Sequence, residues 1–319
     1  MLRMDAFDVV VAESYAHARS LWGPDAMYVA GGTDLLPNIK HGLFRPKRVI
    51  HLGCIKGSVH VSEGELVIGA GITLAELADD TLIQAHLPML AEAARLVAGP
   101  QIRNAGTLGG NILLDTRCLF YNQTEFWRKS LGHCLKAEGT WCHVVGGPKT
   151  CVATQSSDTV PVLLATNAKI TLLGESGARQ VGMRDLYQYN GMDHLKINKG
   201  ELLTEVRIPL KNYRGSYKKL RTRASIDFPQ LGIALVAEKT GSVIDSLEIV
   251  VGAASPQPKP IRGLDAYVGK TLDAASMAEI GDLVYKQTRP QGSVHGDTAW
   301  RRQMAVILTK RALEELCAY

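Results

Sequence analysis

Two glycine-rich turns impose the strongest constraint on how this chain can fold. One spans residues 31–36 (GGTDLL) and the other residues 106–111 (GTLGGN), and each follows an apolar element. A turn without side chains lets the backbone approach a ligand closely, and its successive N–H groups can point into one concavity, which suits a diphosphate. Two such turns in one domain are compatible either with two tight turns or with one diphosphate site.

The apolar pattern around these turns predicts strands and helices in mixed order. Three short strands are expected, at residues 27–30, 48–52 and 65–68. Thr73 and Glu76 have the spacing of a capping box, so a helix is expected to begin there. A second helix is expected to begin near Pro88 and to end at Gly99, which a proline follows.

The later part of the chain predicts a second domain. We expect a buried helix, a hairpin, two strands and two helices, at residues 160–165, 169–173, 233–237, 247–251, 275–285 and 298–316. A polar connection at residues 211–215 interrupts this series. The sequence therefore predicts an α+β protein with two domains, residues 1–212 and 213–319, and 319 residues are enough to give each its own core.

Residues 69–74 (GAGITL) follow a predicted strand and open a predicted helix, as a Rossmann dinucleotide site does. The third glycine of that motif is replaced by Leu74, and no acidic residue follows at the expected distance on a strand end. A simple strand–turn–helix connection explains this segment better.

Composition and short motifs exclude several functional classes. The net charge is +5, from 36 basic and 31 acidic residues, and the basic residues are scattered, which argues against a nucleic-acid groove. No apolar run approaches the ~20 residues of a membrane helix, and Asp5 and Asp8 stand where a signal peptide would be apolar. We therefore expect a cytoplasmic protein. No hydrolase motif or P-loop is present, so a cofactor is expected to supply any chemistry.

Four of the six cysteines fall in one polar stretch, at positions 118, 134, 142 and 151, whereas Cys54 and Cys317 are isolated. The stretch, residues 115–156, shows no sustained helical or strand period and is called the cysteine loop below. Four thiolates suit zinc or an iron–sulfur cluster. Without a Cys-x-x-Cys pair the spacing leaves incidental thiols possible too, and His133 and His143 keep a mixed Cys/His zinc site open.

The glycine motifs, in this order, resemble those of the FAD-binding subunits of the xanthine oxidase family of molybdenum hydroxylases. The resemblance rests on residues 30–36 (AGGTDLL) and 101–112 (QIRNAGTLGGNI), and continues through 157–161 (SDTVP) and 252–258 (GAASPQP). It implies a two-subdomain FAD-binding module, of the kind seen in vanillyl-alcohol oxidase, followed by a smaller α+β domain like the C-terminal domain of the CO dehydrogenase flavoprotein.

The resemblance also implies which residues contact FAD, and it assigns no catalytic residue to this chain. The two turns would hold the diphosphate and ribityl chain, and a few further positions would contact the cofactor. The implied set is Ala30, Gly31, Gly32, Thr33, Asp34, Leu35, Leu36, Val97, Thr107, Leu108, Gly109, Gly110, Asn111, Asp158, Leu203 and Lys219.

One departure from most of the family is the cysteine loop itself, which separates Asn111 from Asp158 by 47 positions. The insertion is similar to one in a branch of the family whose FAD-binding subunit carries an additional [4Fe–4S] cluster. For this chain it implies a cluster on the four loop cysteines: Cys118, Cys134, Cys142 and Cys151.

That branch implies a complex that removes an aromatic hydroxyl group reductively. Its partners would be a large subunit with the molybdenum cofactor, a small subunit with [2Fe–2S] clusters and a low-potential donor such as ferredoxin. The alternatives are an ordinary hydroxylase subunit that passes electrons outward, and a non-enzymatic zinc-loop interaction module.

Overall fold

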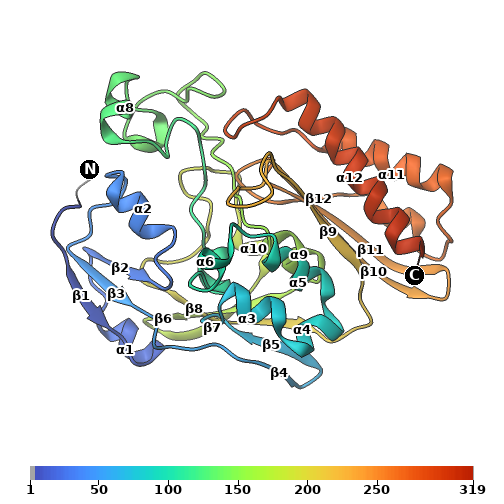
Figure 1. Ribbon diagram of the computed structural model, residues 1–319, viewed down its shortest axis with the longest axis horizontal. Coiled ribbons are helices and arrows are strands. Elements are labelled where there is room, and N and C mark those ends of the chain that lie inside the picture. Colours follow the sequence, from blue (N-terminus) through green and yellow to red (C-terminus); the bar gives the residue numbers. More distant parts are fainter. Residues whose placement is uncertain (1–3, 319) are drawn as a thin grey trace.

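In the computed structural model, which describes residues 4–318, three sheets follow one another along the chain (Figure 1). The first is parallel throughout, with strand order β1-β3-β2 and short helices between successive strands. Its elements are β1 (Asp8–Val11), α1 (Tyr15–Ser20), β2 (Ala26–Val29), α2 (Leu35–Lys40) and β3 (Arg48–His51). The first glycine-rich turn therefore joins the carboxyl end of a parallel strand to a helix, where α/β folds bind ligands.

The second sheet is antiparallel, with strand order β4-β5-β8-β6-β7, and a group of helices packs over one of its faces (Figure 1). Leu66 and Val206 from the strands and Leu77 and Leu90 from the helices are buried in the core between them. The strands are β4 (Val59–Ser62), β5 (Glu65–Gly69), β6 (Lys169–Gly174), β7 (Gly177–Gly182) and β8 (Leu202–Pro209). The helices of this part are α3 (Leu74–Asp79), α4 (Thr81–His86), α5 (Pro88–Arg95), α6 (Pro100–Arg103), α7 (Leu108–Ile112), α9 (Val160–Ala165) and α10 (Met183–Leu186).

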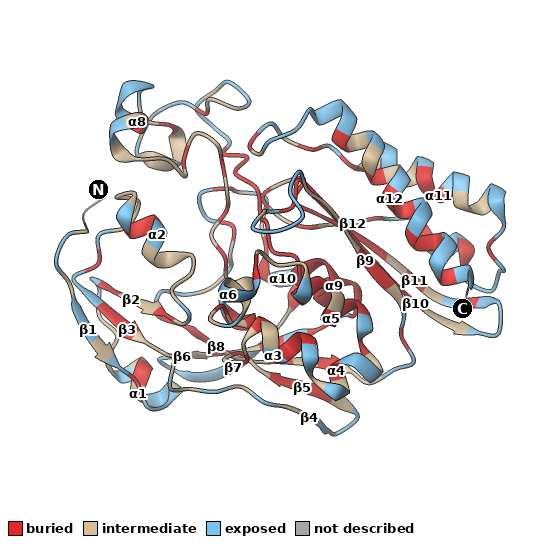
Figure 2. Cartoon of the chain, in the orientation of Figure 1, coloured by how far each residue is buried: buried red, intermediate tan, exposed pale blue. Residues whose placement is uncertain are grey.

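The C-terminal domain is a four-stranded antiparallel sheet, in the order β12-β11-β10-β9, with two long helices on one face (Figures 1 and 2). Its elements are β9 (Arg214–Leu220), β10 (Leu231–Thr240), β11 (Val243–Gly252), β12 (Lys259–Pro260), η2 (Leu264–Tyr267), α11 (Ala274–Gln287) and α12 (Thr298–Ala318). Ile233 and Leu235 of β10 belong to the core with α11 and α12, whereas Ala234 and Val236 belong to the core of the second sheet. Strand β10 is thus buried on both faces, which explains its unbroken apolar sequence.

Several local predictions are confirmed. Thr73 and Glu76 form the capping box: the Glu76 N–H donates to the Thr73 hydroxyl (3.1 Å), and the Thr73 N–H donates to the Glu76 carboxylate (2.9 Å). Helix α9 and the β6–β7 hairpin lie where the pattern placed them. Because β5 pairs antiparallel with both of its neighbours, the glycines that follow it do not belong to a Rossmann unit. No helix in the described range is long and apolar enough to cross a membrane.

The cysteine loop, expected to lack regular structure, contains α8 (Glu125–Ser130) and the 3₁₀ turn η1 (Leu135–Ala137). It projects beyond α2, away from the second sheet (Figure 1). Arg117 and Thr154 close its base, since each donates its backbone N–H to the carbonyl of the other, at 2.8 and 2.7 Å. The loop thus leaves and rejoins the FAD-binding module at one point.

Candidate functional site

A cleft of about 790 Å³ opens among the three parts of the molecule. Both glycine-rich turns line it, together with Val97, Asp158 and Leu203 from the second subdomain. Ile226 and Phe228, from the connection between β9 and β10, add a wall from the C-terminal domain. This volume lies in the range of about 300–1,000 Å³ that small-molecule and cofactor sites occupy.

The first glycine-rich turn presents a row of free donors to the cleft. In the described structure the N–H groups of residues 31–35 donate to no protein acceptor, and the next one, at Leu36, bonds the carbonyl of Gly32. Gly32 has φ +69°, a conformation that glycine adopts readily. Such a row of unpaired N–H groups at the end of a parallel strand suits a diphosphate.

The second turn does not repeat this arrangement, contrary to the expectation of a second concavity of free N–H groups. The N–H groups of Gly106 and of residues 108–111 are all hydrogen-bonded within the protein. Its glycines instead permit close approach. A side chain on Gly31 would overlap the carbonyl of Ala105, so the two turns touch, whereas one on Gly110 would meet only the Thr107 hydroxyl. Gly110 therefore faces open space at the cleft.

The structure brings most of the residues implied for FAD to this one cleft. The lining includes Ala30, Gly31, Gly32, Thr33, Asp34, Leu35, Val97, Thr107, Gly109, Gly110, Asn111, Asp158 and Leu203. Leu36, Leu108 and Lys219 are not in the lining. Leu108 is buried in the core, and the Leu36 side chain lies against Gly32. Lys219 does not line the cleft, but it forms an ion pair with Asp158, which does.

Asp158 and Lys219 form a buried ion pair behind the cleft, with 2.8 Å between the Lys219 Nζ and the Asp158 Oδ2. The Tyr217 hydroxyl donates to the other carboxylate oxygen (2.8 Å), and the lysine also donates to the Leu96 carbonyl (2.9 Å). Burial raises the pKa of Asp158, while Lys219 acts in the opposite direction. The pair fixes the Asp158 carboxyl at the cleft wall and ties β9 to the FAD-binding module.

The four loop cysteines come together, whereas Cys54 and Cys317 are exposed elsewhere. Each of the four is buried, with 5–8% of its surface exposed. Burial raises the pKa of Cys118 to about 12, and the other three thiols add to the rise, so each of them lies within electrostatic range of Cys118. Three of them, Cys118, Cys134 and Cys151, share a small core with Tyr121 and Ala153.

Buried cations accompany these thiols. Lys136 donates to the Asp115 carboxylate (2.6 Å) and the Thr116 hydroxyl (2.5 Å), and its charge acts to lower the pKa of Cys151, although burial raises that pKa overall. Arg128 is buried and donates to the carbonyls of residues 41 and 42, at 3.0 and 3.2 Å. An anionic group held by four thiolates would find compensating charge here.

Zinc and an iron–sulfur cluster place different demands on the arrangement of four thiols. Among the described residues, no group of three or more His, Cys, Asp or Glu side chains is arranged to hold a metal ion. A single zinc ion needs its sulfurs at about 2.3 Å from one centre. In a [4Fe–4S] cluster each thiolate binds a different iron, so the sulfurs stand farther apart. His133 and His143 each have one ring nitrogen engaged with a backbone carbonyl, at 2.9 and 2.7 Å.

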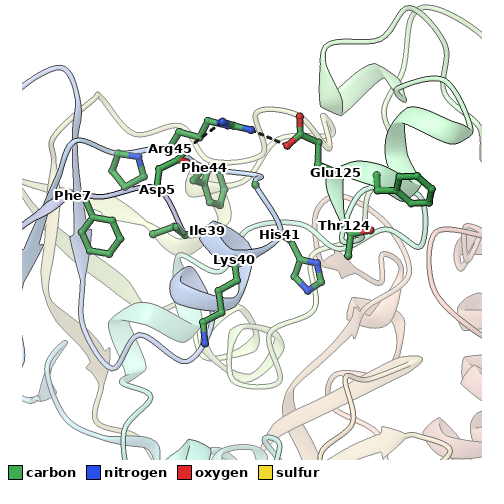
Figure 3. A pocket seen from close by; sticks show the side chains of 12 residues that line it. Asp5, Phe7, Ile39, Lys40, His41, Phe44, Arg45, Thr124 and Glu125 are labelled. Carbon is green, nitrogen blue, oxygen red and sulfur yellow. Dashed lines mark hydrogen bonds and ion pairs between the residues drawn. The ribbon is translucent and has the colours of Figure 1, made fainter. Parts of the chain in front are cut away.

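A second pocket, of about 390 Å³, lies between α2 and the cysteine loop (Figure 3). Arg45 spans its rim, with ion pairs to Asp5 (3.2 Å) and to Glu125 of α8 (2.8 Å). The Phe126 side chain beside it is 84% exposed. The sequence carries no local signal for these contacts, because Arg45 is 40 positions from Asp5 and 80 positions from Glu125.

Comparison with known proteins agrees with this geometry. Residues 5–211 match the FAD binding domain in molybdopterin dehydrogenase, and residues 215–316 match the CO dehydrogenase flavoprotein C-terminal domain. The chain belongs to the family of FAD-binding subunits of the molybdenum hydroxylases. The expected fold, a FAD-binding module followed by this C-terminal domain, is confirmed.

Relatives within this family align over almost the whole chain. The glyceraldehyde dehydrogenase medium chain of Sulfolobus acidocaldarius is 27% identical, over 97% of this chain and 98% of the relative. The aldehyde oxidoreductase FAD-binding subunit of Escherichia coli is 28% identical, over 92% and 91%. The carbon monoxide dehydrogenase structure from Hydrogenophaga pseudoflava superposes with a TM-score of 0.81 at 25% identity, covering 99% of each chain.

Proposed function

We propose that this chain is the FAD- and [4Fe–4S]-binding electron-transfer subunit of a complex of the 4-hydroxybenzoyl-CoA reductase type. Electrons would enter from a low-potential donor such as ferredoxin and pass through the cluster and FAD towards molybdenum on a large subunit. There the aromatic hydroxyl would be removed. The small partner would carry [2Fe–2S] clusters, and the complex would be cytoplasmic.

The observation that carries the proposal is the cysteine loop. Its four thiols are buried, three of them in one small core, and the loop starts and ends at Asp115 and Ser156, which line the cleft. An ordinary FAD-binding subunit has no use for four gathered thiols on its own chain. A subunit that receives electrons one at a time from an iron–sulfur donor does, because a bound cluster accepts single electrons and a bound flavin passes on one or two.

The residues of this chain hold and insulate these groups. In the proposal, the free N–H groups of residues 31–35 bind the FAD diphosphate, Gly110 permits its close approach and Asp158 fixes the cofactor at the wall. Cys118, Cys134, Cys142 and Cys151 bind the cluster, with Lys136 and Arg128 compensating its charge. We also propose that the FAD-binding module ends at residue 212 and the C-terminal domain begins at 213.

The test is preparation of the protein without air, followed by assays for flavin, iron, acid-labile sulfide and zinc. We expect FAD together with about four iron and four sulfide per chain, as a [4Fe–4S] cluster requires, and co-purification with a molybdenum subunit. The chain alone should exchange electrons with artificial dyes but reduce no organic substrate. Stoichiometric zinc without sulfide would exclude the cluster.

A second candidate follows from the relatives, whose names describe oxidations of glyceraldehyde, other aldehydes, carbon monoxide or nicotine. In that case the chain serves a molybdenum hydroxylase that oxidises its substrate and passes electrons outward. Protein with flavin but no iron–sulfur absorbance would favour this candidate. Colourless protein with zinc would favour an interaction module without a redox role.

A further inference from the structure

Arg117 stands at the point where the cysteine loop meets the FAD cleft. Its backbone pairs with Thr154 to close the base of the loop, and the next residue is Cys118. Its side chain reaches Asp34 and is largely buried, with 14% of its surface exposed. Arg117 therefore belongs both to the base of the cysteine loop and to the surroundings of the FAD cleft.

Behind the cleft wall, the Arg117 guanidinium contacts two lining residues from different parts of the molecule. It forms an ion pair with Asp34 in the first glycine-rich turn and donates to the Asn38 side chain (3.3 Å). It also lies over the Phe228 ring, 4.6 Å from the centroid. Asp34 and Phe228 both line the cleft.

The ion pair offsets a repulsion that a bound diphosphate would otherwise meet in the first glycine-rich turn. A diphosphate bound by the N–H groups of residues 31–35 would lie beside the Asp34 carboxylate, and like charges at that distance repel. Among the described residues, Arg117 is the one basic side chain in an ion pair with Asp34. Because the pair is mostly shielded from water, salt screens it weakly.

The contact with Phe228 acts on the part of the wall that the C-terminal domain contributes. The connection between β9 and β10 reaches across to Ala98, where the Ile226 N–H donates to the Ala98 carbonyl (3.0 Å) and the Ser225 hydroxyl approaches the same oxygen (3.3 Å). Phe228 itself is 50% exposed. A cation–π contact from a fixed arginine holds such a ring in one position.

We propose that Arg117 is a positioning residue through which the order of the cysteine loop sets the affinity of the cleft for FAD. When the loop is fixed by its bound group, Arg117 neutralises Asp34 and holds the Phe228 ring in place at the cleft wall. When the loop loses that group, Arg117 loses its fixed place and both effects weaken. The inference rests on the proposed function in that FAD occupies the cleft.

A double-mutant cycle tests the charge contribution, with the full chain in the complex with which it co-purifies. The dissociation constant of FAD is measured by flavin fluorescence after removal and re-addition of the cofactor. R117Q should weaken FAD binding about tenfold in the wild-type background but less than about threefold in the D34N background, because the charge that it leaves unpaired is then absent. R117K should recover much of the loss, since it retains the charge. Equal losses in both backgrounds, or no loss, would overturn the inference.

Removal of iron tests the coupling to the loop. Oxidation and chelation should weaken FAD binding in the wild type, and should add little in R117Q, in which the link is already broken; thermodynamic coupling requires this pattern. Equal losses on iron removal in the two proteins would contradict a role for Arg117. Failure of the proposed function looks different: the wild type would then bind no FAD in the cleft, or would contain no iron to remove.

Discussion

Asn111 accepts hydrogen bonds from the hydroxyls of Ser157 (2.6 Å) and Thr159 (2.7 Å), although 46 and 48 positions separate these residues in sequence. The bonds join the second glycine-rich turn to the segment that carries Asp158. The cysteine loop lies wholly between the bonded residues and leaves them in contact. The cleft should therefore persist when the cysteine loop is perturbed, with FAD affinity lowered only by the contribution of Arg117, and the first two predictions use this.

Gly110→Val should remove FAD and leave the fold intact. The added side chain would enter the open space of the cleft and meet only the Thr107 hydroxyl of the protein. We expect FAD affinity to fall at least about tenfold, since overfilling a fitted space costs roughly 1–3 kcal/mol. Flavin content after desalting and the circular dichroism spectrum are the measurements. Gly23→Val is the matched control, because nothing lies within 4 Å of a side chain there, and it should retain its flavin.

Alanine at Cys118, Cys134, Cys142 or Cys151 should lower iron and sulfide content together and expose the cysteine loop to proteases. The thiols are the buried centre of that loop, so losing the bound group removes what orders it. Much of the FAD should remain, because the Asn111 bonds persist and only the contribution that depends on Arg117 is lost. Cys54→Ala and Cys317→Ala are the controls, since both residues are exposed and remote from the loop. Iron loss in a control but in none of the loop variants would refute the ligand assignment.

Lys136→Met should lower the reduction potential of the proposed cluster by an amount on the order of tens of millivolts. Lys136 is a buried cation whose charge acts on Cys151. Without it the reduced, more negative state loses stabilisation, and Asp115 is left uncompensated. A redox titration followed by electron paramagnetic resonance measures the shift. Lys136→Arg keeps the charge and should stay near the wild-type potential, whereas equal shifts in both variants would indicate a packing effect.

Lys219→Met should destabilise the protein by roughly 3–5 kcal/mol, the usual cost of leaving one partner of a buried ion pair alone. Asp158 would lose its only described ion-pair partner, and its pKa, already raised by burial, should rise further. Thermal or denaturant unfolding of the FAD-free protein measures the loss. The double variant with Asp158→Asn should recover part of it, because no unpaired charge then remains. A double variant as unstable as the sum of its parts would argue against the pair.

Local signals in the sequence predicted much of the fold. The Thr73 capping box and helix α9 are specified by neighbouring residues, so they could be recognised without tertiary information. The seven unpredicted helices have only four to six residues each, too few to show a helical period; they are α1, α2, α4, α6, α7, α8 and α10.

The residues of the candidate site likewise form two groups, those that a local sequence signal predicts and those that it does not. The glycine-rich turns were visible because backbone approach requires particular residue types within a few positions. Phe228 and Arg117 carry no such signature, since their place at the cleft depends on contacts between distant segments. Leu36 and Leu108 sit within the motifs, but local helix geometry turns their side chains into the protein.

The backbone pairing of Arg117 with Thr154 has an evolutionary consequence. A segment whose two ends share one pair of hydrogen bonds can be gained or lost without moving the scaffold that carries it. An ancestral flavin subunit could have acquired the segment in a single insertion, and a shortened chain that joins residue 117 to 154 by a tight turn should still fold. The cysteine loop would then be a module that can be added to an otherwise unchanged flavoprotein.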